Sequence, residues 1–180
     1  AEIWNLELEK KLNKALFLDR DGIINFDYGY VYKISDFDFL DGIFDLVKLA
    51  KSCGYKIIVI TNQSGIARGY YSLKQFQNLS KWMCDKFSEN NASIDKIYFS
   101  PYHPRGIILK YKKNHITRKP KPGMIFLAQK EYKINLKKSI LLGDKISDIE
   151  AGINAGVGKN IILSNNSEIK KNNDFYVIKK

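Results

Sequence analysis

Apolar residues in this chain form short continuous runs that alternate with stretches of helical periodicity. The continuous runs predict buried strands, because each is about as long as a strand in a compact domain: Lys14–Leu18, Tyr55–Thr61, Asp95–Phe99, Ser139–Gly143 and Gly158–Leu163. A further run at Phe175–Ile178 predicts a sixth strand. Strands that are apolar on both faces are typical of parallel sheets covered by helices on both sides.

The segments between the strands carry apolar residues at helical spacing. They predict four helices: Asp41–Cys53, Ser72–Glu89, Pro122–Tyr132 and Ser147–Ala155. Ser72 is suited to an N-cap and Pro122 to a first helical turn. Strand and helix therefore alternate, which predicts an α/β fold: a doubly wound parallel sheet with helices on both faces and no large cap domain. The sequence contains no repeat or linker, so we expect one domain over residues 1–180.

Two segments lack such a pattern. Residues 23–39 are rich in aromatic and acidic side chains without a sustained period, and we expect an irregular flap in which a short hairpin could form. Residues 100–122 contain all four prolines of the chain, so regular structure is disfavoured there. Long loops in compact domains are usually functional or disordered, and we expect this one to be shaped and functional.

The charge of the chain is concentrated in that second segment. Thirty basic residues against 19 acidic ones give a net charge of +11. The 35 residues from Lys96 to Lys130 contain nine basic side chains and no acidic one. Such a stretch is either a solvated loop or a surface that meets an anion, and its composition fits nucleic acid as well as a small anionic ligand.

Cysteine use and hydropathy indicate the compartment. Cys53 and Cys84 are too few for a disulfide framework, and we expect both to be small buried residues in a reducing environment. No apolar run reaches the roughly 18 residues that a membrane span needs. The first residues also lack the basic, then apolar, profile of a leader peptide. The sequence therefore predicts a cytoplasmic protein without membrane association.

Clusters of polar residues follow three of the predicted strands directly, and a fourth cluster precedes a helix: Asp19–Gly22, Thr61–Gly65, Gly143–Asp148 and Arg118–Gly123. Open parallel sheets bind their ligands at the carboxyl ends of strands, so we expect one shared site. Three carboxylates would repel one another there unless a cation intervenes: Asp19, Asp21 and Asp144. Mg²⁺ is a hard ion suited to such oxygen ligands.

Hydrogen-bond donors and cations complete this pattern. Thr61 and the amides that follow it supply neutral donors, whereas Arg118 and Lys119 supply positive charge. Carboxylates with a metal on one side and cations on the other suit a phosphoryl group, whose charge spreads over its oxygens in the transition state. The clusters therefore predict a phosphoryl-transfer site.

Four segments in this order resemble the motifs of the haloacid dehalogenase superfamily of phosphohydrolases: FLDRDGIIN (Phe17–Asn25), ITNQSGIARG (Ile60–Gly69), RKPKPGM (Arg118–Met124) and LLGDKISDIEAG (Leu141–Gly152). The similarity covers about Lys14 to Leu163. Within the superfamily the chain is similar to the heptose bisphosphate phosphatases, with the histidinol-phosphate phosphatases as close relatives. The resemblance implies a Mg²⁺-dependent phosphomonoesterase that removes the 7-phosphate of D-glycero-D-manno-heptose 1,7-bisphosphate, in the biosynthesis of nucleotide-activated heptose.

The same resemblance implies the roles of single residues. Asp19 is the expected nucleophile, which forms an aspartyl phosphate, and Asp21 the general acid and base. Thr61 and Lys119 are expected to hold the phosphoryl oxygens. The expected Mg²⁺ ligands are Asp19, the backbone carbonyl of Asp21, and Asp144, with Lys145 and Asp148 adjacent to the metal. Eight residues match positions that recognise the substrate: Asp27, Tyr28, Gly29, Tyr30, Asn62, Gln63, Ser64 and Arg118. We expect the small phosphorylated sugar to be the partner, and the protein to be a monomer.

One departure from the family pattern concerns a structural zinc. Many members bind it through Cys-x-His after the third strand and Cys-x-Cys ahead of the Arg-Lys pair. Ser100, Tyr102 and Thr117 stand at three of those four positions here, and His115 at the fourth. One histidine cannot make a closed tetrahedral site, so we expect no structural zinc. A metal shared by His103 and His115 remains an alternative to two solvated or hydrogen-bonded histidines.

Three other functions are weighed against the leading one. Histidinol-phosphate hydrolysis or a broader phosphomonoesterase activity would use the same residues. A nucleic-acid-binding or end-processing protein would use the basic segment along a phosphate backbone, with steep salt dependence. No predicted helix carries a regular basic stripe, which favours a small substrate over nucleic acid. A catalytically inactive scaffold is disfavoured, because all four motifs keep their acidic and basic members.

Overall fold

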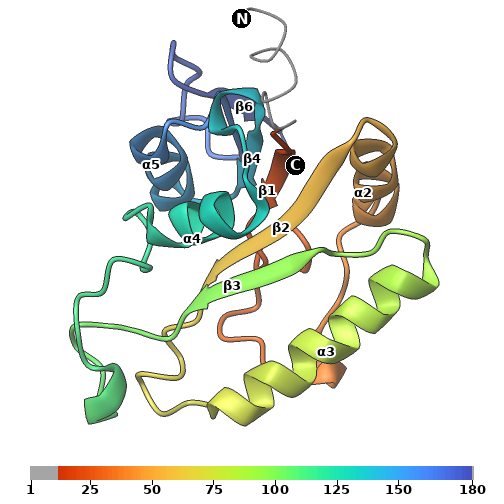
Figure 1. Cartoon of the computed structure of the whole chain (residues 1–180). Coiled ribbons are helices and arrows are strands. Elements are labelled where there is room, and N and C mark those ends of the chain that lie inside the picture. The colour runs from red at the N-terminus through yellow and green to blue at the C-terminus, as the bar shows by residue number, and fades with distance from the viewer. Residues whose placement is uncertain (1–11, 180) are drawn as a thin grey trace, which may run out of the picture.

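The computed structural model of this protein describes residues 12–179 (Figure 1). The N-terminal residues on which the absence of a leader-peptide profile rests lie outside this part. The strands are β1 (Lys14–Leu18), β2 (Tyr55–Asn62), β3 (Lys96–Ser100), β4 (Ile140–Gly143), β5 (Lys159–Leu163) and β6 (Tyr176–Ile178). The helices are α2 (Ile43–Ser52), α3 (Leu73–Glu89), α4 (Gly123–Tyr132) and α5 (Ile146–Ala155), and the short 3-10 turns are η1 (Ile34–Asp36), η2 (Leu109–Tyr111) and η3 (Leu136–Lys138).

The six strands form one parallel sheet in the order β3-β2-β1-β4-β5-β6. The chain winds from β1 outward to β3, then crosses to β4 on the other side of β1 and winds outward again to β6. The winding direction therefore reverses between β1 and β4. Such a reversal opens a crevice outside the carboxyl ends of the two strands, which is where sheets of this kind bind ligands.

Alternate residues of the central strands enter two separate cores, because successive side chains of a strand point to opposite faces. Ala15 and Phe17 of β1 pack into the core beneath α4 and α5, whereas Leu16 and Leu18 pack into the core beneath α2 and α3. Figure 1 shows the helices in the same two layers. The predicted doubly wound sheet with helices on both faces is confirmed.

The predicted elements are present with boundaries shifted by at most two residues. Ser72 caps α3 as expected: its side chain accepts a hydrogen bond from the Gln75 amide, and the Gln75 side chain accepts one from the Ser72 amide. Pro122 stands one position earlier than expected, at the N-cap of α4 rather than in its first turn. The sixth strand, which had the weakest signal, is β6.

The described residues of the flap are mostly irregular, with the 3-10 turn η1 and single bridges, of which Asn25 with Phe39 is antiparallel. Two other expectations need correction. The proline-rich loop is not wholly irregular, since η2 forms between its prolines. Cys53 is exposed at the C-cap of α2 and Cys84 is half-buried, because a helix end and the edge of an amphipathic helix face leave these positions partly outside the cores.

The long loop after β3 extends away from the sheet and runs beside the segment that joins β2 to α3 (Figure 1). The amides of Ile107 and Ile108 both donate to the carbonyl of Ala67, which ties the two segments together. Gly106 permits this approach, because a Cβ there would lie 2.8 Å from the Ala67 carbonyl oxygen. No helix within residues 12–179 is long and apolar enough to cross a membrane.

Candidate active site

A cluster of carboxylates stands at the crevice between β1 and β4. Asp19 follows β1, Asp144 follows β4, and Asp148 lies in the first turn of α5. Each offers an oxygen within 4.8 Å of the oxygens of the other two. The sequence predicted that Asp19 and Asp144 would meet here, but it placed Asp148 only beside the metal.

Two glycines make room for this cluster. Gly22 has a φ of +90°, and a Cβ on it would lie 2.1 Å from Oδ2 of Asp144. A Cβ on Gly143 would lie 2.3 Å from Cβ of Asp148. A side chain at either position would displace an acidic residue, so the glycines let these carboxylates approach Asp19.

Lys119 is buried against the cluster. Its Nζ lies 2.8 Å from Oδ1 of Asp19 and 2.6 Å from Oδ1 of Asp148, and it donates to the carbonyl of Ile60 at 2.9 Å. All three ionisable side chains are nearly inaccessible to solvent. The fold thus brings Lys119 into contact with the predicted nucleophile, which lies 100 positions away in the chain.

Burial dominates the electrostatics of this group. Desolvation, and next the charge of Asp148, raise the pKa of Asp19 to about 7, although Lys119 acts in the opposite direction. Burial also disfavours the ammonium of Lys119, but Asp148 and Asp19 outweigh that effect and raise its pKa. Asp19 and Asp148 therefore share the buried ammonium of Lys119, and Asp144 lies beside these two carboxylates.

The second oxygen of Asp148 has a structural task. Oδ2 accepts hydrogen bonds from the amides of Asp144 at 3.1 Å and of Lys145 at 3.0 Å. An acidic side chain in the first turn of a helix satisfies amides that have no partner within the helix. Asp148 thereby fixes the loop that carries Asp144 while its other oxygen contacts Lys119.

Asp21 is held by a different set of donors. Arg20 donates from Nη2 to both carboxylate oxygens, at 2.8 and 2.9 Å, and from Nε to Oδ1 at 3.2 Å. Asn25 and Gln63 donate to Oδ1 and Oδ2 at 3.1 and 3.2 Å. The carboxylate of Asp21 is not part of the three-carboxylate cluster found among residues 12–179.

The residues after β2 form a buried hydrogen-bond chain. Gln63 donates from Nε2 to Oγ1 of Thr61 at 2.8 Å as well as to Asp21, and its Oε1 accepts from the Tyr71 hydroxyl. Gly65 allows the Tyr71 ring to reach this position, because a Cβ there would lie 2.2 Å from the ring. Gln63 is expected to bind substrate, but its side-chain amide connects Thr61 to Asp21 by hydrogen bonds.

Asn62 and Ser64 take different positions. Asn62 accepts from the Lys119 amide at 3.0 Å and donates to the Lys119 carbonyl at 3.1 Å, so it clamps the backbone of the residue that contacts Asp19. Ser64 is half-buried, and its carbonyl accepts from the amide of Arg68. The predicted substrate role of Asn62 is thus joined by a structural one.

The flap meets the site through one ion pair. Oδ2 of Asp27 lies 2.9 Å from Nζ of Lys145, which follows Asp144 directly. Gly29 donates its amide to Asp27, and Tyr28 donates to Asp38 within the flap. The exposed ring of Tyr30 packs edge-on against Tyr70. Of the four expected flap residues, Asp27 is therefore the one tied directly to the β4 side of the site.

The four positions at which the family pattern places zinc ligands lie together. Oγ1 of Thr117 donates to Oγ of buried Ser100 at 3.2 Å and lies 2.8 Å from Nδ1 of His115. The rings of Tyr102 and His115 pack with centroids 4.2 Å apart. Neither His103 nor His115 belongs to the group of three metal-ligating side chains found within residues 12–179. Hydrogen bonds and ring packing therefore connect these four positions.

Two residues with clear contacts were missed as functional candidates. Arg20 lies in the first motif, but nothing in its sequence position shows that it folds back onto its own neighbour. Arg68 lies at the end of the second motif, and its Nη2 lies 3.1 Å from Nε2 of His103. A signal for Arg68 existed, since a basic residue in an otherwise apolar and glycine-rich loop is a candidate anion ligand.

The donor set at the crevice fits Mg²⁺. Three carboxylate oxygens lie close together, and the buried ammonium of Lys119 contacts two of these residues, Asp19 and Asp148. Hard oxygen ligands of this kind suit Mg²⁺, and a divalent cation would relieve the repulsion among the carboxylates. The arrangement can hold a metal on one side of a phosphoryl group and the Lys119 ammonium on the other.

Comparisons with known proteins agree with this geometry. The sequence matches the family described as polynucleotide kinase 3 phosphatase over residues 18–175. A Burkholderia mallei protein named D-glycero-alpha-D-manno-heptose-1,7-bisphosphate 7-phosphatase is 54% identical over 84% of this chain and 80% of its own length. A Helicobacter pylori protein (strain 26695) named for the beta form of the same substrate is 51% identical over 86% of both chains.

A solved structure has the same fold. The D,D-heptose 1,7-bisphosphate phosphatase of B. bronchiseptica, complexed with magnesium and phosphate, superposes with a TM-score of 0.80 and covers 92% of both chains. Its sequence is 23% identical to this one, so the likeness shows the fold alone.

Proposed function

Because this chain belongs to the polynucleotide kinase 3 phosphatase family, and within it to the haloacid dehalogenase-like heptose bisphosphate phosphatases, we propose that it removes the 7-phosphate of D-glycero-D-manno-heptose 1,7-bisphosphate. It is a phosphoric monoester hydrolase, as its relatives are named. The observation that carries the proposal is the contact of the Lys119 ammonium with both Asp19 and Asp148 at the crevice between β1 and β4. The proposed reaction is a step in the biosynthesis of nucleotide-activated heptose.

In the proposed reaction, a carboxylate oxygen of Asp19 attacks phosphorus in line. The bond between phosphorus and the sugar oxygen breaks, and Asp21 gives that oxygen a proton. Water then attacks the phosphorus of the aspartyl phosphate while Asp21 takes up a proton from it. The bond to Asp19 breaks, and inorganic phosphate leaves with both carboxyl groups restored.

The contacts of these residues support their roles. Arg20, Asn25 and Gln63 fix the Asp21 carboxylate beside the nucleophile. Thr61 and Lys119 supply a hydroxyl and an ammonium for the phosphoryl oxygens as charge develops on them. Asp19, Asp144 and Asp148, with the Asp21 carbonyl, would hold Mg²⁺, which when bound offsets the charge of the carboxylates and of the phosphoryl group.

Substrate selection is proposed to lie on three segments near the crevice. The first is residues 27–30 of the flap, whose link to the site is the Asp27–Lys145 ion pair. The other two are Asn62, Gln63 and Ser64 after β2, and Arg118 before Lys119. We also propose that the protein acts as a single domain and a monomer in the cytoplasm, with its two cysteines free and no structural zinc.

A second candidate is a 3′-phosphatase acting on nucleic acid ends. Two observations favour it: the description of the matched family, and the nine basic residues without an acidic one from Lys96 to Lys130. Within the described residues no helix presents those charges as a stripe; they lie on β3, the long loop and α4. The heptose bisphosphate therefore remains the preferred substrate.

A comparison of substrates tests the proposal. Steady-state kcat/KM is measured with Mg²⁺ on both anomers of the heptose bisphosphate, on histidinol phosphate and on a 3′-phosphorylated oligonucleotide, with the Asp19→Asn variant as the background. We expect one anomer of the bisphosphate to be the best substrate and Asp19→Asn to be inactive. A higher kcat/KM for histidinol phosphate or for the oligonucleotide would replace the proposed substrate.

A further inference from the structure

A group of cations without acidic partners lies beside the proposed phosphoryl site. Burial and the guanidinium of Arg68 lower the pKa of Arg118, and burial together with Arg118, Arg68 and Arg105 lowers the pKa of His103. Contacts place two of these arginines at the ring: Nη2 of Arg68 lies 3.1 Å from Nε2 of His103, and the Arg105 amide donates to Nδ1 at 3.0 Å. Within residues 12–179, no ion pair joins Arg68 or Arg118 to a carboxylate.

This group contains one hydrogen-bond donor more than its acceptors can satisfy. Nδ1 of His103 accepts from the Arg105 amide at 3.0 Å, so the neutral ring carries its proton on Nε2. That N–H faces Nη2 of Arg68 at 3.1 Å, and an arginine can only donate. In the opposite tautomer, the proton on Nδ1 would face the N–H of the Arg105 amide, so two donors would again face each other. The buried Nε of Arg68 also lacks a hydrogen-bond partner.

Both arginines are close in sequence to residues of the proposed site. Arg118 precedes Lys119, whose ammonium contacts Asp19. Arg68 follows the segment Thr61–Ser64 by one turn, and its amide donates to the Ser64 carbonyl. Arg118 donates from Nη1 to the carbonyl of Tyr102 at 3.3 Å, which leaves its remaining N–H groups for another acceptor.

We propose that Arg68 binds, together with Arg118 and the Nε2–H of His103, the phosphate of the substrate that is not cleaved. The inference rests on the proposed function, because it needs a substrate with two phosphates. A phosphate oxygen between Arg68 and His103 accepts from both and supplies the acceptor that the group lacks. The planar fork of a guanidinium suits two phosphate oxygens at once.

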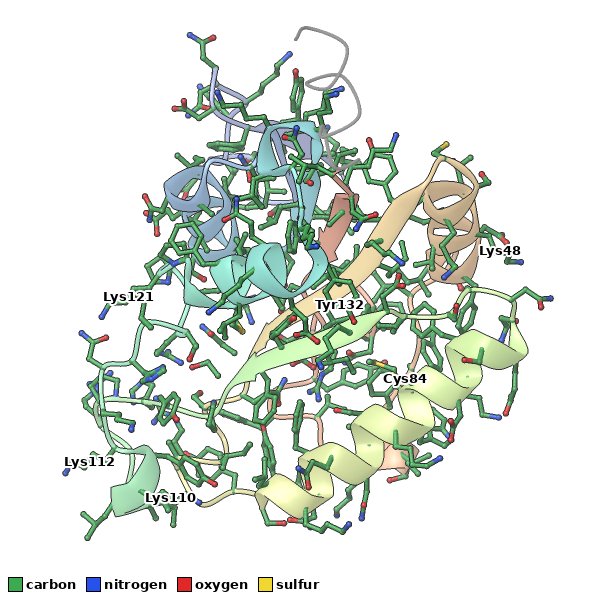
Figure 2. All side chains as sticks on the ribbon, in the orientation of Figure 1. Lys48, Cys84, Lys110, Lys112, Lys121 and Tyr132 are labelled. Carbon is green, nitrogen blue, oxygen red and sulfur yellow. The ribbon has the colours of Figure 1, made fainter. Side chains whose placement is uncertain are left out.

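The rest of the basic segment does not share this placement. Lys110 and Lys112 are exposed at the outer end of the long loop, away from the sheet (Figure 2). Charges at such positions are screened by solvent and salt. Lys112 therefore provides a matched control: it lies in the same segment and carries the same charge, but it lies outside the group around His103.

The test compares Arg68→Gln with Lys112→Gln on two substrates, the heptose 1,7-bisphosphate and the heptose 7-phosphate that lacks the second phosphate. For Arg68→Gln, we expect KM for the bisphosphate to rise about 10- to 100-fold with kcat nearly unchanged, as for the loss of a charged hydrogen bond. Kinetics on the 7-phosphate should stay at the wild-type level. Arg68→Lys should recover part of the loss, and Lys112→Gln should match the wild type.

Binding of the product gives an independent readout. Heptose 1-phosphate, titrated into Arg68→Gln by calorimetry, should bind about 10-fold or more weakly than to the wild type. Equal losses of kcat/KM on both substrates, or unchanged product binding, would overturn the role of Arg68 and leave the proposed reaction standing. Wild-type enzyme inactive on both sugars would overturn the proposed function and this inference with it.

Discussion

Arg20 and Asp21, neighbours in the sequence, form a bidentate ion pair in which one guanidinium nitrogen contacts both carboxylate oxygens at 2.8 and 2.9 Å. Arg20 is 1% exposed and also donates to the Val31 carbonyl at 2.7 Å. The proposed general acid is therefore anchored to the flap through a buried side chain. The same guanidinium therefore connects Asp21 to the backbone of the flap.

Arg20→Lys is expected to lower kcat about 10- to 100-fold with little change in KM, because an ammonium cannot reproduce the fork that orients Asp21. Steady-state kinetics on the bisphosphate checks this, and thermal unfolding shows whether the variant is folded. A folded Arg20→Lys protein with wild-type kcat would show that the ion pair serves only the flap.

Lys119→Met is expected to abolish turnover and to destabilise the protein by about 3–5 kcal/mol in the absence of Mg²⁺, because it leaves two buried carboxylates without their cation. Urea unfolding measures the loss. Adding Asp148→Asn removes one of those carboxylates, so the double variant should lose less stability than the sum of the single variants. Strictly additive losses would mean that Lys119 and Asp148 do not stabilise each other.

Gly22→Ala is expected to raise the Mg²⁺ concentration for half-maximal activity at least about 10-fold, because the new Cβ would displace Asp144, a ligand of the proposed metal site. Gly42→Ala is the matched control: Gly42 has a similar φ of +78° but nothing within 4 Å of a Cβ. Both variants should lose about 1–2 kcal/mol of stability to the positive φ. If Gly42→Ala also raises the Mg²⁺ requirement, backbone strain and not the contact with Asp144 is the cause.

Removal of metals should distinguish a catalytic Mg²⁺ site from the structural zinc site of the family pattern. Activity lost to EDTA is expected to return in full with Mg²⁺ alone, and elemental analysis of the purified protein should show no stoichiometric zinc. Thr117→Val should destabilise the loop by about 1 kcal/mol, since it removes a buried hydroxyl that bonds to Ser100. A zinc requirement for refolding would contradict this account.

Stability is expected to fall as the pH drops below about 6.5. Burial and the surrounding arginines hold the pKa of His103 below its usual value, so the unfolded chain takes up a proton first and is favoured in acid. Above 6.5 both states are neutral at this residue and nothing is lost. Urea unfolding at pH 7.5 and 5.5 should show a smaller acid loss for His103→Gln than for the wild type; an equal loss would assign the effect to other groups.

Local sequence patterns predict most of the strands and helices of this fold. The continuous apolar runs are β1 to β5, since a strand buried on both faces needs apolar residues at every position, and the Ser72 cap follows from the residues at the start of α3. The acidic and basic motifs at the strand ends predicted that Asp19 and Asp144 would meet. Topology brings them together, because carboxyl ends of parallel strands share one edge of the sheet.

Other relationships depend on long-range packing that no local pattern encodes. Asp148 reaches Lys119 only because α5 begins against the loop that carries Lys119, and Gln63 joins Thr61 to Asp21 only because β1 and β2 are neighbours. Arg68 faces His103 because the loop after β3 folds back over the segment after β2. The sequence alone determined where the apolar runs occur along the chain and which polar residues follow them. The tertiary structure decided which of those charges are buried together, since burial and partner choice depend on contacts between residues far apart in the chain.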